Sequence, residues 1–481
     1  MSVGNHPELG RTVLRGGVDD ACALAEKIRS KQQSARETTV AALDSIAKLN
    51  PVLNCFTAVL REPALAQADD VDRSIAAGVD PGALAGVPFA AKNLFDIEGV
   101  TTLAGSKIRS GESAAVRDAT AVERLKQAGA ILLGTLNMDE FAYGFTTENS
   151  HYGATRNPHD IERVAGGSSG GSASAVAAGL VPMALGTDTN GSVRVPAAFC
   201  GVFGFKPTYG RISRAGVFPL AYSLDCVGPF GRSVRDVALA FDLLHGPDPR
   251  DPVASRRPPS PCLSGIEDGI SELRIAVAEG YFANLGSAEV FQPVTKAAAA
   301  LGITRTITIP DIEMARSAAY VITACEGGNL HLNDLRSRPG DFDPHVVERF
   351  MAGAVLPASW YLQAQRFRFL FRKQMRELFE KVDVILAPTT PCPAIKIGQP
   401  TISVGGVELP ARANIGVFTQ PLSFVGLPII SVPIFEDGQL PLGVQVAGAP
   451  YNETAVLRVA AQLERMGVAR APVAIPAGPA E

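Results

Sequence analysis

Three short turns carry the side chains with the strongest potential for chemistry. The first, GVPFAAKN (residues 86–93), ends an apolar run on Lys92. Burial disfavours the charged form of an amine, so a lysine held there would have a lowered pKa and could act as a neutral base near pH 7. The alternative is a lysine that extends its ammonium group to solvent.

The second turn, GGSSGGS (residues 166–172), directly precedes the apolar run AVAAGLVPMALG. This position favours a tight turn that opens a helix, with backbone N–H groups suited to an anion or oxyanion. A phosphate loop would need a lysine where the chain has Ser172. The GxSxG match at 167–171 offers a rival: Ser169 as the nucleophile, with His245, His331 or His345 as its base.

The third turn, GTDTNGSVRVP (residues 186–196), follows a strand-like run and places Ser192 at the end of a small polar loop. A nucleophile held there could attack a carbonyl beside several free backbone N–H groups, which would form an oxyanion hole. Taken alone, the segment is equally compatible with an ordinary turn.

Alternating short apolar runs and helical stretches from about 85 to 240 predict an α/β fold, in which helices cover both faces of a sheet. The expected strands include GVPFAA, AILLG and VPMALGTD, and later LRIAVAE, VDVILAP, PIISVPIF and LGVQVAGA. Helices are expected at 121–128 and 453–466.

The predicted organisation has three parts. Residues 1–65 form a helical region, in which a capping box at Ser34–Glu37 begins a helix that Asn50–Pro51 should end. Residues 66–470 form the main domain, with the motifs concentrated at 85–240 and a Pro-rich surface linker at 247–262. Residues 471–481 are expected to be a loose tail.

Composition excludes several function classes. The chain has 481 residues, 44 basic and 48 acidic, without a Lys/Arg-rich run, which argues against nucleic acid as a partner. The longest apolar stretch is too short to span a membrane. Seven scattered cysteines without CxxC, six histidines without HExxH spacing and an N-terminus without a signal pattern predict a cytoplasmic protein with no metal and no cofactor.

Taken together and in this order, the three turns resemble the amidase-signature family, whose pattern includes the 24-residue spacing from Ser168 to Ser192. The resemblance covers about residues 20–470. It implies the amidase-signature fold, a large mixed central β-sheet covered by α-helices on both faces.

The resemblance also implies a Ser–cis-Ser–Lys triad that hydrolyses amides through an acyl-enzyme. Ser192 would be the nucleophile, Ser168 would follow a cis peptide bond and relay the proton, and Lys92 would be the base. The implied oxyanion hole consists of the backbone N–H groups of Thr189, Asn190, Gly191 and Ser192. Asn190 stands where many relatives have glycine, and asparagine should tolerate a positive φ there.

Two groups within the family are similar to this chain. LNMDEFAYGFTTENSHYGATRNP is similar to the A subunit of glutamyl-tRNA(Gln) amidotransferases, but ANIGVFTQPLSFVGLP lacks the acidic residue that holds the amine of glutamine in those proteins. DTNGSVRVP together with EGGNLHLNDLRSRP is similar to enzymes that hydrolyse 1-carboxybiuret. This second likeness implies a small GatC-like partner subunit, in a heteromer or a dimer of heterodimers.

Three alternatives remain open: hydrolysis of another small amide, the glutaminase role of an amidotransferase, and a non-catalytic binding or scaffold protein. The last would require loss of a triad residue, and all three are present. To hold a substrate carboxylate, the sequence suggests Arg336 or Arg338 with His331 or Asn333 nearby. Alternatively, both arginines are surface residues paired with Asp341 or Asp343.

Overall fold

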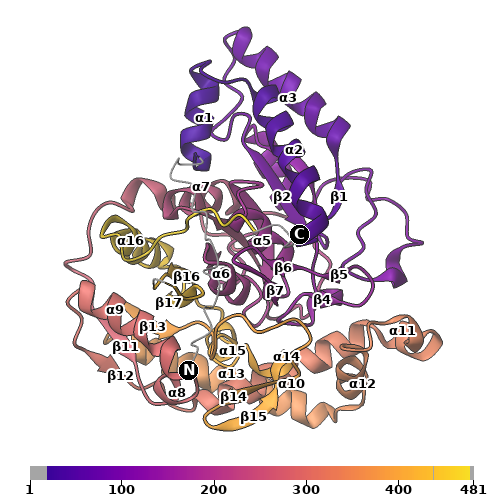
Figure 1. Cartoon of the computed structure of the whole chain (residues 1–481). Coiled ribbons are helices and arrows are strands. Elements are labelled where there is room, and N and C mark those ends of the chain that lie inside the picture. The colour runs from indigo at the N-terminus through magenta and orange to yellow at the C-terminus, as the bar shows by residue number, and fades with distance from the viewer. Residues whose placement is uncertain (1–18, 437, 477–481) are drawn as a thin grey trace, which may run out of the picture.

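One large mixed β-sheet runs through the computed structural model, which describes residues 19–436 and 438–476 (Figure 1). Its centre is antiparallel, whereas β2 pairs in parallel with both β3 and β8, and β11 pairs in parallel with β12 and β13. In spatial order its strands are β1 (Phe56–Val59), β3 (Ile131–Leu136), β2 (Pro88–Lys92), β8 (Met183–Asp188), β10 (Cys226–Gly231), β9 (Phe203–Lys206), β16 (Ile429–Ile434), β17 (Leu442–Gly448), β13 (Val384–Pro388), β11 (Ile275–Ala278) and β12 (Thr306–Ile307).

Three two-stranded ribbons lie outside this sheet. They are β4 (Glu148–Asn149) with β5 (Gly153–Ala154), β6 (Arg156–Asn157) with β7 (Asp160–Val164), and β14 (Thr401–Val404) with β15 (Val407–Pro410). Each of the seven strands predicted from the apolar runs is present as a strand of the main sheet.

Helices cover both faces of the sheet, which confirms the predicted fold class. α5 and α6 pack together on one face, whereas α7 and α16 pack together on the other. The helices are α1 (Ala21–Arg29), α2 (Ala35–Leu53), α3 (Arg61–Ala76), α4 (Thr120–Gln127), α5 (Gly170–Ala177), α6 (Arg194–Cys200), α7 (Val234–Leu244), α8 (Tyr281–Asn284), α9 (Gln292–Ala300), α10 (Ile312–Leu330), α11 (Leu332–Ser337), α12 (Val347–Val355), α13 (Ala358–Phe379), α14 (Ala411–Asn414), α15 (Gln420–Ser423) and α16 (Glu453–Arg465).

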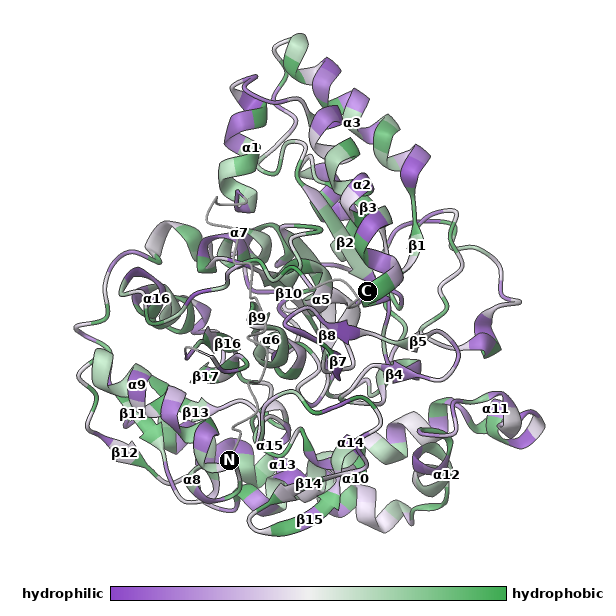
Figure 2. Cartoon of the chain, in the orientation of Figure 1, coloured by the Kyte–Doolittle hydropathy of each residue, from purple (hydrophilic) through white to green (hydrophobic). Residues whose placement is uncertain are grey.

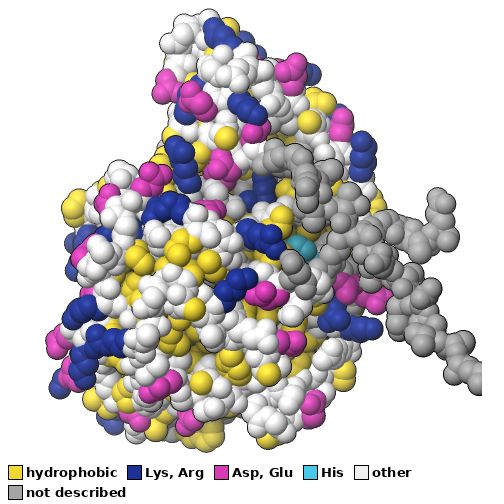
Figure 3. Space-filling view, turned by 60° about the vertical axis from the view of Figure 1, so that its left-hand side comes forward, with side chains coloured by type: hydrophobic (Ala, Val, Ile, Leu, Met, Phe, Trp, Pro, Cys, Tyr) yellow, Lys and Arg dark blue, Asp and Glu magenta, His cyan; other side chains and the backbone are white. Residues whose placement is uncertain are grey.

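Alternation along the strands explains the two-sided core. On β2, Phe89 and Ala91 join the larger hydrophobic cluster, while Ala90 joins the cluster beneath α5 and the N-terminal helices. The hydropathy colouring is green along the central strands, and α3 alternates green and purple (Figure 2). On the face drawn in Figure 3, basic and acidic side chains are interspersed.

The N-terminal region places α1, α2 and α3 in one lobe above the sheet (Figure 1). The capping box at Ser34 and Glu37 is present, as predicted. However, α2 continues through Pro51 to Leu53, and it ends where the Asn50 side chain bonds the backbone of Phe56 in both directions, at 2.7 and 3.1 Å. β1 then pairs with β3 at the edge of the main sheet, so the same sheet extends into this region.

The predicted surface linker and the predicted C-terminal tail both contain buried residues. Residues 247–262 contain neither helix nor strand, yet Asp248 and Asp251 within them are buried. In the described part of the tail, Ala474 is buried and its N–H donates to the carbonyl of Ala177 at 2.8 Å. Residues 471–476 are therefore docked rather than loose, and 477–481 lie outside the described residues.

Candidate active site

Lys92 ends β2 with its side chain completely buried. Its Nζ lies 2.8 Å from Ser168 Oγ and 2.9 Å from Thr187 Oγ1, and none of the ion pairs among the described residues includes it. Burial lowers the pKa of Lys92 to about 7, although the more distant carboxylates of Asp139, Asp225 and Asp188 oppose the shift. The amine is thus held inside the protein, in contact with two hydroxyl groups.

The Ser168 turn precedes α5, as the sequence predicted. The Gly167–Ser168 peptide bond is cis, Gly166 has φ +81°, and Ser168 is completely buried. A side chain at Gly167 would collide with the carboxylate of Asp139, so the close approach of these two segments requires glycine at this position.

The Ser192 turn is held by a buried ion pair between Asp188, the last residue of β8, and Arg194, the first of α6. The Asp188 carboxylate also accepts the N–H groups of Gly191 and Val193 at 2.8 and 3.2 Å. Burial alone would raise the pKa of Asp188, but Arg194 and these donors hold it below its usual value. This network fixes the loop that carries Ser192.

Replacing Arg194 with methionine should destabilise the fold by about 3–5 kcal/mol, because the Asp188 carboxylate would remain buried without its partner. Denaturant unfolding would measure the loss. The matched control is Arg338→Met, which breaks the exposed 2.9 Å ion pair with Asp334 and should cost no more than about 1 kcal/mol. Equal losses in the two variants would show that the buried pair does not hold the loop.

The two serine turns touch, since the N–H of Ser169 donates to the carbonyl of Ser192 at 3.3 Å. Ser192 Oγ itself makes no hydrogen bond among the described residues, and its side chain lines a narrow cavity, here called the Ser192 cavity. The hydroxyl that the sequence singled out as a nucleophile is therefore free to meet a ligand.

Four backbone N–H groups were expected to form the oxyanion hole. The structure commits that of Gly191 to Asp188, whereas those of Thr189, Asn190 and Ser192 find no acceptor within the described residues. Three donors therefore remain beside Ser192. Within the turn the positive φ occurs at Gly191, at +135°, and not at Asn190. The expected tolerance of asparagine for a positive φ is therefore not needed.

Ser169 does not have the surroundings that the GxSxG interpretation requires. Its Oγ donates to the carbonyl of Thr187 at 3.2 Å and accepts the Thr187 N–H at 3.3 Å. His245 stacks on Phe241 and bonds backbone groups on both ring nitrogens, and neither His331 nor His345 bonds Ser169. The structure thus ties Ser169 to the backbone of β8.

The four residues suggested for carboxylate binding do not gather around Ser192. His331 is buried among aromatic rings, 4.1 Å from the Phe141 centroid, and burial lowers its pKa to about 4. Asn333 and Arg336 on α11 and Arg338 just after it are exposed, and α11 lies at the periphery in Figure 1. None of the four lines the cavity, and Arg338 pairs with Asp334 rather than with Asp341 or Asp343.

Instead, α10, α12 and α15 supply polar side chains to the Ser192 cavity. They are Tyr320, Thr323, Arg349 and Gln420, joined by Tyr143 from the loop after β3. Periodicity gives no signal for them, because tertiary packing alone brings these distant segments together. Arg349 lies on α12, beyond the segment EGGNLHLNDLRSRP from which the sequence suggested its candidates.

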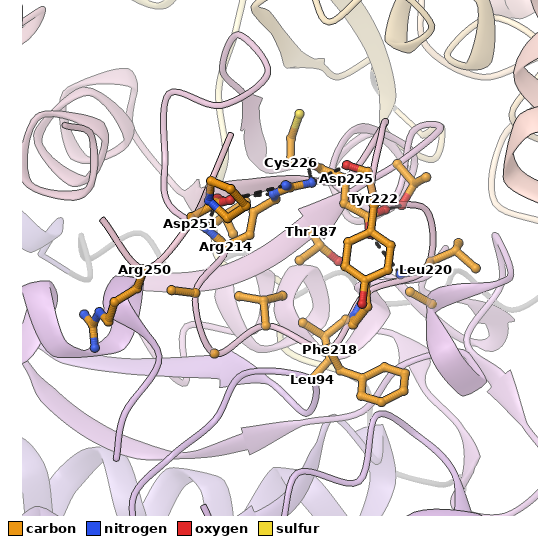
Figure 4. Close-up of a pocket in the computed structure, with 18 residues that line it drawn as sticks. Leu94, Thr187, Arg214, Phe218, Leu220, Tyr222, Asp225, Cys226, Arg250 and Asp251 are labelled. Atoms are coloured by element: carbon orange, nitrogen blue, oxygen red, sulfur yellow. Dashed lines mark hydrogen bonds and ion pairs between the residues drawn. The ribbon is translucent and has the colours of Figure 1, made fainter. Parts of the chain in front are cut away.

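A second cavity of about 280 Å³, here called the Thr187 cavity, is shown in Figure 4 and shares Ala142, Thr189 and Leu220 with the Ser192 cavity. Its wall includes Thr187, the partner of Lys92. Asp225 accepts a 2.6 Å hydrogen bond from Thr189 there and Arg214 pairs with Asp251, so these charged groups already have partners. Neither Ser168 nor Ser192 lines this larger cavity.

Other site types find no support in the described residues. No group of three or more histidine, cysteine, aspartate and glutamate side chains there is arranged to hold a metal ion. None of the described helices is long and apolar enough to cross a membrane.

The chain belongs to the amidase family, whose model matches residues 37–457. It is 50% identical to AtzE, a 1-carboxybiuret hydrolase subunit of Pseudomonas sp. (strain ADP), over 93% of this chain and 98% of that protein. It is 39% identical to the A subunit of the glutamyl-tRNA(Gln) amidotransferase of Carboxydothermus hydrogenoformans, over 92% and 96% of the two chains.

Solved structures give the same relationship. One described as a vestigial protein complex that reveals the origins of an s-triazine catabolic enzyme has a TM-score of 0.93 and 49% identity, and covers 94% of this chain and 99% of its own. A bacterial aryl acylamidase of the amidase-signature family has a TM-score of 0.84 and 30% identity, and covers 93% and 96%. The chain is an amidohydrolase that acts on the C–N bond of amides.

Proposed function

We propose that the chain hydrolyses the terminal amide of 1-carboxybiuret with Ser192, Ser168 and Lys92 as its triad. The observation that carries the proposal is the buried Lys92 amine, 2.8 Å from Ser168 Oγ, with a pKa near 7. Such an amine is neutral in a substantial fraction of molecules at pH 7 and can accept a proton. The choice of substrate is supported by the 50% identity to a known 1-carboxybiuret hydrolase chain.

The reaction proceeds in two acyl-transfer steps. Ser192 Oγ attacks the terminal carbonyl while its proton passes to Ser168 Oγ, whose own proton passes to Lys92. The free N–H groups beside Ser192 stabilise the oxyanion. Lys92 then returns the proton through Ser168 to the leaving nitrogen, the C–N bond breaks, and ammonia departs. Water then attacks the carbonyl of the acyl-enzyme and passes a proton through Ser168 to Lys92. The proton returns to Ser192 Oγ as its bond to the acyl group breaks, which releases 1,3-dicarboxyurea.

Arg349 is the cation that would hold the substrate carboxylate. Its Cζ lies 3.7 Å above the Tyr143 ring, its Nη1 donates to the Tyr143 carbonyl at 2.9 Å, and its buried Nε has no hydrogen-bond partner among the described residues. No carboxylate among the described residues forms an ion pair with Arg349. A carboxylated substrate in the Ser192 cavity would supply the missing counter-ion.

Glutamine fits this cavity less well. The residues that line it include no aspartate or glutamate, so the ammonium group of glutamine would be buried without a partner. An uncharged amide end avoids this cost, which favours a ureide over an amino acid.

Turnover of 1-carboxybiuret, followed as ammonia release, tests the substrate. Arg349→Met should lower kcat/KM by about 30- to 5000-fold for 1-carboxybiuret, the equivalent of about 2–5 kcal/mol, and far less for uncarboxylated biuret. Arg338→Met is the control, because this exposed arginine lies just after α11 and does not line the Ser192 cavity, and it should change neither value. Failure to release ammonia, or an equal loss in both arginine variants, would contradict the proposal.

We further infer that the chain works in the cytoplasm with a small GatC-like subunit. The likeness to a protein solved as part of a complex supports the partner. Scattered cysteines without a CxxC pair are typical of proteins from a reducing compartment.

A further inference from the structure

Asn190 carries a buried hydrogen-bond acceptor that no described residue satisfies. The residue is only 7% exposed, and its Oδ1 has no partner among the described residues. Buried polar groups in native proteins are nearly always hydrogen-bonded, so an orphaned acceptor calls for a specific cause. Asn190 lines the Ser192 cavity, where a ligand could supply the missing donor.

Thr323 on α10 fixes which end of the Asn190 amide faces the cavity. Asn190 Nδ2 lies 2.8 Å from Thr323 Oγ1, and the Thr323 hydroxyl donates its single hydrogen to the carbonyl of Ala319 at 2.8 Å. The Thr323 oxygen can therefore only accept from Asn190. The NH₂ end of the amide must face Thr323, which leaves the carbonyl oxygen as the free end.

The backbone of the turn sets where this acceptor lies relative to the reaction. The backbone carbonyl of Asn190 accepts a 2.7 Å hydrogen bond from Thr419 Oγ1. The backbone N–H of Asn190 is one of the three free donors at the Ser192 turn. One residue thus offers an N–H that can meet the carbonyl oxygen of the scissile amide and a side-chain oxygen that can meet a donor next to it. This donor–acceptor pair matches the edge of a ureide, in which an N–H adjoins the carbonyl.

We propose that Asn190, oriented by Thr323, is a specificity-determining residue that selects amides bearing an N–H next to the scissile carbonyl over amides bearing a CH₂ there. This deepens the proposed function and rests on it, because the selected group is the one that biuret-type substrates share. A CH₂ at that position would leave the Asn190 oxygen buried and unpaired, whereas an N–H would satisfy it.

Two probes of equal length separate these groups: 3-ureidopropionate and glutaramate. Both have a carboxylate, three connecting atoms and a terminal carboxamide, and they differ only in N–H against CH₂ beside the carbonyl. Titration calorimetry on Ser192→Ala protein, which does not consume either probe, would measure their affinities. We expect the ureide to bind roughly tenfold or more tightly than the alkyl amide.

The variants locate the cause of that preference. Added to Ser192→Ala, Asn190→Gly should bring the two affinities to near equality. Thr323→Val should do the same, because it releases the amide while keeping the side-chain shape. Thr323→Ser keeps the hydroxyl and should keep the preference. Equal binding of the probes to the parent, binding of neither, or a preference that survives Asn190→Gly would overturn the inference.

The test is independent of turnover. If 1-carboxybiuret is not hydrolysed but the ureide preference depends on Asn190, the substrate proposal fails and this inference stands. If 1-carboxybiuret is hydrolysed and the preference is absent, this inference alone fails.

Discussion

Ser192→Ala should abolish amide hydrolysis, with kcat at least about 10⁴-fold lower, while the melting temperature stays within a few degrees of that of the parent. Ser192 Oγ makes no structural hydrogen bond in the described residues, and the turn is held through Asp188 and Arg194. The hydroxyl can therefore be removed without loosening the loop. Ammonia release and thermal unfolding would measure the two effects.

Ser169→Ala is the matched control, since it removes a hydroxyl from the Ser168 turn, which touches the Ser192 turn. Its Oγ bonds only the backbone of Thr187, so its loss should leave most of the activity. A serine-directed reagent should label Ser192 in the parent and nothing in Ser192→Ala. Activity that survives Ser192→Ala but not Ser169→Ala would reinstate the GxSxG interpretation.

The sequence predicted the strands and the three turns because these depend on local signals. Apolar runs bounded by glycine and proline identify buried strands, as at Pro88–Lys92. The same local logic failed at Pro51, where it predicted a helix end. A proline in the last turn removes one N–H that the helix does not need to sustain its earlier turns, and Asn50 bonds Phe56 beyond the end.

The walls of the active site could not be predicted in this way. Arg349 and Thr323 have no spacing relation to Ser192, and they share its cavity because α10 and α12, which pack against each other, both contribute side chains to it. The segment at 331–338 was suggested because its two arginines could pair with a substrate carboxylate. Once folded, that composition places α11 at the surface, where arginine and asparagine remain hydrated.

The catalytic activity of the parent should rise with pH through about 7 and then reach a plateau, because only neutral Lys92 can accept the proton from Ser168. Lys92→Met should lose several orders of magnitude at every pH. Lys92→Arg should be equally inactive, since a guanidinium group stays charged and cannot act as the base. A pH profile of kcat/KM that is flat between 6 and 9, or an active Lys92→Arg, would contradict the assignment.

The same pKa predicts that the stability contributed by Lys92 also rises with pH. An unfolded lysine titrates near 10.4 and the folded Lys92 near 7, so between these values the unfolded chain binds the extra proton. The free energy of unfolding contributed by Lys92 therefore rises with pH across that window, and the full penalty, roughly 5 kcal/mol, applies below pH 7. Lys92→Met should be more stable than the parent at pH 6, and this advantage should shrink steadily towards pH 10. Denaturant unfolding of both proteins at several pH values would measure the difference, and a constant difference would mean that the amine is not held neutral by burial. An inactive variant whose gain in stability disappears only near pH 10, where the unfolded lysine also loses its charge, would tie the cost of burying this amine to its function.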